Sequence, residues 1–153
     1  MAKAKRYEVE GTLEWVRVFE DNRDMEGFQG AYEDCDGAYT LDAILDKENT
    51  TLFKASGTAK KGRETEDGEF AVKFVRKHIG PFKKVGGPPV VVWDDGTPYD
   101  FDDEGTIGNG STGRILFEVY PTKAGINGTR LVKLTIIGHV AYVPMEDEDG
   151  VPV

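Results

Sequence analysis

In two segments of the chain, apolar and polar residues alternate as they do in β-strands, and cationic side chains lie in the polar row. Residues 69–78 place Lys73 and Lys77 opposite an apolar row, and residues 112–120 place Arg114 opposite another. Successive side chains of a strand point to opposite faces, so each apolar row belongs to the core and each cationic row to the surface. Lysine and arginine neutralise phosphate groups. These rows therefore predict a surface that holds a polyanion.

Two aromatic residues could add base stacking to this surface. Tyr120 ends the row that contains Arg114, and Trp15 lies in residues 12–19, where apolar side chains occur on both sides of the alternation. That segment is expected to be a strand covered on both faces. A ring exposed beside cations can stack on an unpaired base whatever its identity. Tyr120 and Trp15 are therefore candidate stacking residues.

Charge is segregated along a chain whose formal net charge is −9. Residues 54–84 carry nine basic and four acidic side chains, and residues 112–143 carry four and one. Residues 1–53, 94–111 and 144–153 sum to −7, −6 and −4. An acidic protein can therefore present a basic face.

The chain closes with an acidic segment directly after an apolar strand. Its carboxylates are those of Glu146, Asp147, Glu148 and Asp149. Such a run is typical of an interaction tail that competes for a site meant for another polyanion. The sequence predicts one domain over residues 1–144 and an acidic C-terminal tail over residues 145–153.

Strand-like periodicity dominates the elements that must position these residues. Strands are expected over residues 12–19, 37–45, 69–78, 90–93, 112–120 and 131–143. One short helix is expected over residues 51–56, capped by Asn49 or Thr50 and ended by Gly57. About six strands with one short helix predict an all-β fold, an OB-fold-like antiparallel barrel. A jelly roll or an immunoglobulin-like sandwich is the structural alternative.

The inward rows of these strands supply the expected core. Its members include Phe70, Val72, Phe74, Ile115 and Phe117. In the loop Ile107-Gly-Asn-Gly-Ser111, Asn109 is expected to make a tight turn with positive φ. The segment lacks the Gly-Lys-Ser/Thr ending of a phosphate-binding loop.

Enzymatic activity is not expected. A metal-dependent nuclease could use the six carboxylates of residues 94–104, but two-metal sites need carboxylates that converge from rigid elements, and these lie in one loop. His78 and His139 lack a recognisable catalytic spacing. No metal or cofactor is therefore expected. A virion or scaffold β-barrel that binds protein is the alternative to a nucleic-acid binder.

The single cysteine and the hydropathy pattern indicate a soluble protein of a reducing cytoplasm. Cys35 alone excludes an internal disulfide and a Cys-based zinc site. No run approaches the ~18 apolar residues of a membrane span. No membrane association is expected.

The order of these features resembles that of the single-stranded DNA-binding proteins of tailed phages, the small OB-fold replication proteins of podophages and their relatives. The motifs that carry the resemblance are Gly11-Thr12, Gly37-Ala38-Tyr39-Thr40-Leu41, Phe70-x-Val72-Lys73-Phe74, Val90-Val91-Val92, Ile107-Gly-Asn-Gly-Ser111 and Tyr120-Pro121, followed by the acidic segment. The resemblance covers residues 11–149. Its departures are Asp36 and Leu116 at positions where the family has cations, and a short tail without a terminal Phe.

The resemblance implies sequence-independent binding of single-stranded DNA during phage DNA replication, recombination or repair in the cytoplasm of the infected host. It implies DNA contacts by Lys73 and Arg114 and by a basic N-terminal segment, matched here by Lys3, Lys5 and Arg6. It also implies an acidic tail that covers the DNA groove and docks the phage DNA polymerase or helicase-primase. A homodimer is a further expectation.

Overall fold

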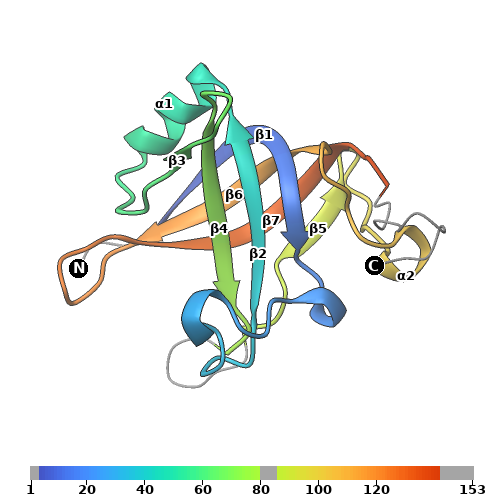
Figure 1. Ribbon diagram of the computed structural model, residues 1–153, viewed down its shortest axis with the longest axis horizontal. Coiled ribbons are helices and arrows are strands. Elements are labelled where there is room, and N and C mark those ends of the chain that lie inside the picture. Colours follow the sequence, from blue (N-terminus) through green and yellow to red (C-terminus); the bar gives the residue numbers. More distant parts are fainter. Residues whose placement is uncertain (1–3, 80–85, 142–153) are drawn as a thin grey trace.

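The computed structural model describes residues 4–79 and 86–141 of the 153-residue chain (Figure 1). Its strands are β1 (Lys5–Arg17), β2 (Ala38–Leu45), β3 (Arg63–Glu64), β4 (Phe70–Lys77), β5 (Val90–Trp93), β6 (Thr112–Tyr120) and β7 (Gly128–Gly138). Its helices are α1 (Lys47–Ala55) and the four-residue α2 (Phe101–Glu104), with 3-10 turns at Glu20–Asn22 and Phe28–Gly30.

The strands form one open seven-stranded sheet in the order β3-β4-β2-β1-β6-β7-β5. This all-β, OB-fold-like architecture with one short helix confirms the predicted fold class. All pairs of neighbours are antiparallel except β5 and β7, which run parallel. That pair departs from the expected antiparallel barrel. The short β3, which pairs with β4 at the edge of the sheet, falls outside the strands that the sequence predicts.

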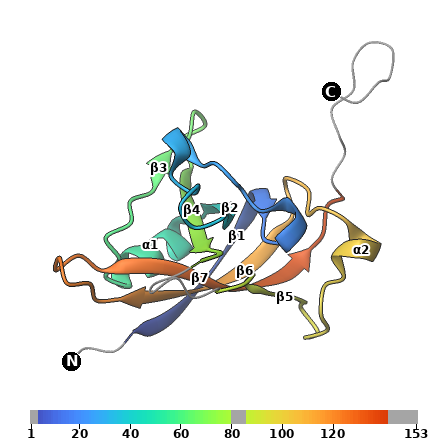
Figure 2. The same ribbon diagram turned by 90° about the horizontal axis from the view of Figure 1, so that it is seen from below.

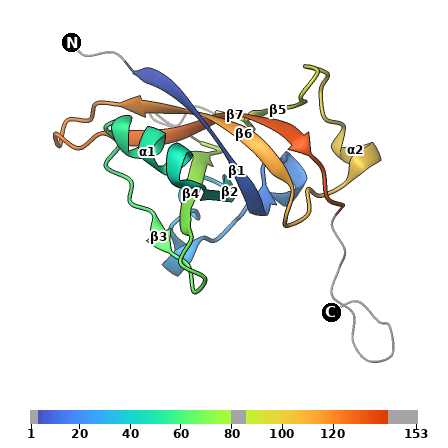
Figure 3. The same ribbon diagram turned by 90° about the horizontal axis from the view of Figure 1, so that it is seen from above.

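Strand β1 joins the two halves of the sheet because it changes partner along its length. Its first part pairs with β6 as far as Thr12, and from Thr12 onward it pairs with β2. Gly11 allows this crossing, since a Cβ there would lie 2.6 Å from the carbonyl oxygen of Ile44. Figure 3 shows β1 running obliquely over β6.

A bulge at Trp15 changes which side chains of β1 face the core. The register with β2 shifts between Glu14 and Arg17, and Trp15 has a φ of 51°. The shift places Val16 inside with Leu13, whereas Trp15 is 63% exposed. The expectation of a strand covered on both faces is therefore wrong: the apolar residues on both sides of the alternation reflect a change of phase.

Helix α1 begins earlier than the sequence indicates. Asp46 is its N-cap, and the Asp46 carboxylate accepts a hydrogen bond of 2.8 Å from the backbone N–H of Asn49. Asn49 is thus in the first turn rather than at the cap. The expected end is confirmed within a residue, at Ala55 before Gly57. The helix buries Phe53 against the core of the sheet, where the centroid of its ring lies 5.8 Å from that of Phe74.

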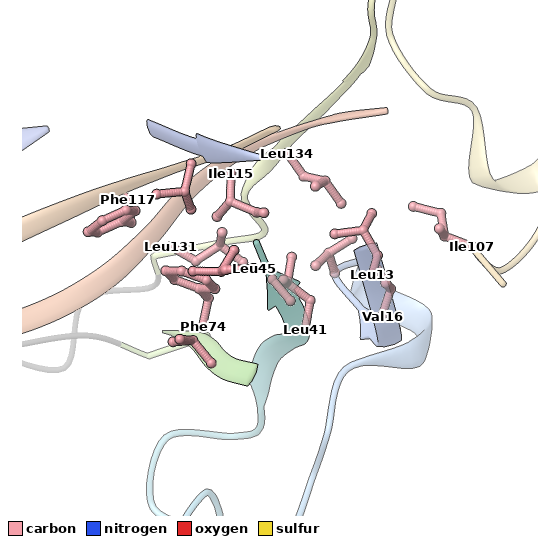
Figure 4. Close-up of a cluster of buried hydrophobic side chains, with 14 of the residues drawn as sticks. Leu13, Val16, Leu41, Leu45, Phe74, Ile107, Ile115, Phe117, Leu131 and Leu134 are labelled. Atoms are coloured by element: carbon pink, nitrogen blue, oxygen red, sulfur yellow. The ribbon is translucent and has the colours of Figure 1, made fainter. Parts of the chain in front are cut away.

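The core fills the space enclosed by β1, β2, β4, β6 and β7 (Figure 4). Strands β4 and β6 confirm the expected alternation, because Val72, Phe74, Ile115 and Phe117 are each 0% exposed. The core residues labelled in Figure 4 are Leu13, Val16, Leu41, Leu45, Phe74, Ile107, Ile115, Phe117, Leu131 and Leu134. Phe70, at the start of β4, is only partly buried against this core, and the cations of the opposite rows face outward.

The two helices lie at opposite ends of the molecule (Figures 2 and 3). The segment after α1 is fastened to the start of β7, because Ala59 N–H donates to the carbonyl of Asn127 over 3.2 Å and Thr58 pairs with Thr129 through their hydroxyls. Helix α2 lies beyond β5, in the loop that leads to β6.

Candidate nucleic-acid interface

Lys73 faces outward from β4 and shares a buried carboxylate with Arg63. The Asp42 Oδ1 atom lies 3.7 Å from the Lys73 ammonium, and its Oδ2 atom accepts a hydrogen bond of 2.9 Å from Arg63. The Asp42 side chain is 7% exposed, whereas those of Lys73 and Arg63 are 46% and 56% exposed. We call these three residues the Asp42 cluster. Two accessible cations therefore lie around one buried carboxylate.

The register of the strands brings the three residues of the Asp42 cluster together. Asp42 of β2 pairs with Lys73 of β4 on one side and with Glu14 of β1 on the other. Arg63 reaches the same carboxylate because β3 pairs beside β4, with Arg63 opposite Ala71. Directly paired residues on one face lie close enough for their side chains to meet. The cluster therefore follows from topology and is not visible in local sequence spacing.

Trp15 is the most exposed aromatic side chain near this cluster. It follows Glu14, so it lies about 10 Å from Lys73 across two strand spacings. A positive φ is unusual for a bulky residue, and such strained backbone is concentrated at functional sites. The Asn109 Oδ1 atom accepts a hydrogen bond of 2.8 Å from the Trp15 N–H and braces the bulge. The bulge therefore presents the indole to solvent, one residue after Glu14, which pairs with Asp42.

Asn109 does not adopt the conformation expected for it. The positive φ in that loop belongs to Gly110, at 94°. Gly108 is required by close approach instead, because a Cβ there would lie 2.6 Å from the carbonyl oxygen of Val140. The Ser111 hydroxyl donates to the Gly108 carbonyl over 2.8 Å. The loop is thus a structural clamp between β1 and the chain after β7, and it positions Trp15.

A second outward group lies on β1, β6 and β7. Glu118 accepts hydrogen bonds from Arg130, at 3.0 and 3.2 Å, and lies 3.8 Å from the Arg6 guanidinium. The Arg130 guanidinium lies 4.9 Å from the centroid of the Tyr120 ring. We call Arg6, Glu118, Tyr120 and Arg130 the Glu118 cluster. It combines two cations, one carboxylate and a half-buried ring.

Arg114 lies between the two clusters and pairs with Asp94. Its side chain is 39% exposed. Strand register separates Arg114 from Lys73 by three strand spacings and four residues along β1, or about 20 Å along the curved sheet. The predicted DNA residues are thus spread over the outer surface of the sheet. Asp94, the first of the carboxylates in residues 94–104, forms the ion pair with Arg114.

The other predicted contact residues lie at the margins of the sheet. Lys77 ends β4 and Lys5 begins β1, and both are exposed. Among residues 4–79 and 86–141, no carboxylate lies within the 4.0 Å ion-pair limit of either ammonium. Lys3 and the tail residues Glu146, Asp147, Glu148 and Asp149 lie outside the described residues.

Four charged residues of these clusters were not among the sequence-based candidates: Arg63, Arg130, Asp42 and Glu118. Arg63 lies outside the strands that the sequence predicts, and Arg130, the third residue of β7, comes just before the strand expected from residue 131. Asp42 carries the wrong charge for a phosphate contact. The signal for Asp42 was a lone carboxylate within an otherwise apolar strand, Ala38–Leu45, since a buried charge needs a partner.

Two negative observations concern only the described part of the chain. Within it, no group of three or more His, Cys, Asp or Glu side chains is arranged to hold a metal ion. His78 is hydrogen-bonded through Nδ1 to the Tyr39 hydroxyl at 2.7 Å, and the His139 ring packs on Trp93. In the same residues, no helix is both long and apolar enough to cross a bilayer.

Comparison with known proteins identifies the fold. No family model and no curated protein matches the sequence. The single-stranded DNA-binding protein of bacteriophage Enc34, solved in complex with ssDNA, matches with a TM-score of 0.61 at 9% identity, over 88% of this chain and 87% of that chain. The fold is that of phage single-stranded DNA-binding proteins. The T7 protein gp2.5, also a single-stranded DNA-binding protein, matches with a TM-score of 0.57 at 18% identity, over 92% and 95% of the two chains.

Proposed function

We propose that this protein binds single-stranded DNA without sequence preference, on the outer face of its sheet. The observation that carries the proposal is the exposed indole of Trp15, held at positive φ beside the Asp42 cluster. Stacking on aromatic rings together with cation contacts to phosphates is the mode of sequence-independent single-strand binding. The fold shared with the Enc34 and T7 proteins supports the same function.

The two clusters have complementary tasks in this proposal. The Asp42 cluster and Trp15 hold one stretch of the strand by phosphate contact and stacking. Arg114 and the Glu118 cluster continue the path across β6 and β7, with Lys77 and Lys5 as further phosphate contacts at its ends. Lys3 is a further proposed contact. Each paired cation must exchange its carboxylate for a phosphate. Binding is therefore expected to be salt-sensitive, with only a few phosphates neutralised.

The biological setting is part of the proposal. We place the protein in the cytoplasm of an infected bacterium, where it coats single strands during phage replication, recombination or repair. The tail Glu146-Asp147-Glu148-Asp149 competes for the cationic face and docks the phage polymerase or helicase-primase. The chain acts as a binding protein, without catalysis or a cofactor, and a homodimer is its proposed assembly.

The test is equilibrium binding of labelled oligo(dT) and of a duplex of equal length, followed by fluorescence anisotropy over a salt series. Single-strand binding should be clearly tighter, because stacking of about 1–3 kcal/mol per base needs unpaired bases. Equal affinity for both DNAs would contradict the proposal. Failure to bind either would favour the alternative, a scaffold β-barrel that binds protein.

A further inference from the structure

A pocket of about 310 Å³ lies between the end of α1, the chain that follows it and the first residue of β4. Its lining residues are Phe53, Lys54, Thr58, Lys60, Lys61, Gly62 and Phe70. We call this cavity the lysine pocket. It carries three cations and no carboxylate. Its volume lies at the lower end of the range of small-molecule sites, which suits one small anionic ligand.

The pocket offers two kinds of contact. The Lys54 ammonium lies 5.2 Å from the centroid of the Phe70 ring, so cation and aromatic face are adjacent. Gly62 allows the ring to approach this closely, because a Cβ there would lie 2.2 Å from the Phe70 Cζ atom. Phosphate and a flat base together would satisfy both the ammonium groups and the ring.

The lysines of this pocket have no acidic partner among the described residues. Among residues 4–79 and 86–141, none of Lys54, Lys60 and Lys61 has a carboxylate within the 4.0 Å ion-pair limit. Burial lowers the pKa of the Lys60 ammonium, the positive charge of Lys73 lowers it further, and Asp42 opposes both. A bound phosphate would offset that burial and repulsion.

The pocket walls are held in place before any ligand binds. Thr58 pairs with Thr129 of β7 through the two hydroxyls, and the Asn127 side-chain amide donates to the Gly57 carbonyl over 3.0 Å. Gly62 is the residue before Arg63, so the lining continues directly into the Asp42 cluster. A strand bound at that cluster has this pocket as its neighbour.

We propose that the lysine pocket binds one nucleotide of the DNA strand, with its phosphate held by Lys54, Lys60 and Lys61 and its base against Phe70. This inference rests on the proposed single-strand binding and adds a contact that the outward strand rows do not supply. It extends the strand path from the sheet face to the end of α1.

The binding test compares Lys61→Glu with Lys47→Glu, because both lysines are exposed and Lys47, in the first turn of α1, lies outside the pocket. One lost phosphate contact lowers the magnitude of the salt slope by about 0.7 and the affinity for oligo(dT) at least about fivefold at ~0.1 M salt, and the reversed charge adds repulsion to this loss. We expect this loss for Lys61→Glu and for a second variant, Lys54→Glu. Lys47→Glu should stay within about twofold of the unmodified protein by the same salt relation.

Binding at the lysine pocket is tested directly by NMR chemical-shift changes in the isotope-labelled full chain. Three ligands are added separately: thymidine 5′-monophosphate, thymidine and inorganic phosphate. The mononucleotide should shift the Phe70 ring signals and the Lys60 side-chain signals more than either partial ligand does. This readout separates the two proposals: if the protein does not bind oligo(dT), a mononucleotide shift at Phe70 still supports the pocket. Unmoved Phe70 signals at saturating oligo(dT), together with unchanged affinity of Lys61→Glu, would overturn it.

Discussion

Replacing Asp42 by asparagine should tighten DNA binding while weakening the fold. In the free protein, Asp42 holds the Arg63 guanidinium at 2.9 Å and the Lys73 ammonium at 3.7 Å. A phosphate must compete with this carboxylate for both cations. Asp42→Asn removes the competing charge, and its side-chain oxygen can still accept a hydrogen bond from Arg63.

The size of the effect follows from one additional cation available to phosphate. Each phosphate contact to a single strand contributes about −0.7 to the slope of log K against log salt, so one more contact raises affinity about fivefold at ~0.1 M salt. The carboxylate is buried but its partners are half exposed. The loss in unfolding free energy should therefore be about 1–2 kcal/mol, between the values for an exposed pair and for a charged hydrogen bond.

Anisotropy titration with oligo(dT) at four salt concentrations measures the affinity, and urea unfolding measures stability. Asp67→Asn is the matched control, because Asp67 is exposed in the turn between β3 and β4 and the change in net charge is the same. A folded Asp42→Asn protein with unchanged affinity and unchanged salt slope would refute the reasoning, since it would show that phosphates do not approach Arg63 or Lys73.

Four further outcomes are expected. Lys73→Glu and Arg114→Glu should each weaken oligo(dT) binding tenfold or more at ~0.1 M salt, through a lost contact and added repulsion, and should change the urea midpoint little. Binding that survives both changes would show that the outward rows of β4 and β6 are not the DNA-binding surface. Phe74→Ala should lower the unfolding free energy by about 3–5 kcal/mol in urea, because that ring is 0% exposed. Asn109→Ala should cost about 0.5–1.5 kcal/mol by losing the hydrogen bond at the β1 bulge, and should weaken DNA binding by freeing the adjacent tryptophan. Truncation after Pro144 should tighten DNA binding severalfold at low salt and abolish polymerase or helicase-primase binding in a pull-down; unchanged affinity at low salt would limit the tail to partner docking.

The fold could be predicted where the side-chain pattern matches strand geometry. Strands β4 and β6 have clean alternation in sequence, and their inward residues are buried as expected except for Phe70, which is partly buried. Periodicity failed where the backbone departs from a regular strand. The bulge at Trp15 shifts the phase of β1, and the two-residue β3 is too short to produce a pattern.

The arrangement of the outward residues could be predicted only in part. Alternation correctly placed Lys73 and Arg114 on outward faces. It could not show that each is paired, because Asp42 and Asp94 come from elements distant in sequence and are brought in by sheet order. The same holds for the lysine pocket, whose walls come from α1, a loop and the start of β4.

The most direct test of single-strand binding is the fluorescence of Trp15 in a Trp93→Phe protein during titration with oligo(dT) and with duplex. Trp15 is 63% exposed, whereas Trp93 packs 5.1 Å from Tyr99 and 5.4 Å from His139, measured between ring centroids. We expect saturable quenching by oligo(dT), weaker binding of duplex, and a slope of log K against log salt of about −2 to −3.5 for 3–5 neutralised phosphates. Trp15 emission that oligo(dT) leaves unchanged, or equal affinity for duplex, would contradict the proposal that this surface binds unpaired DNA.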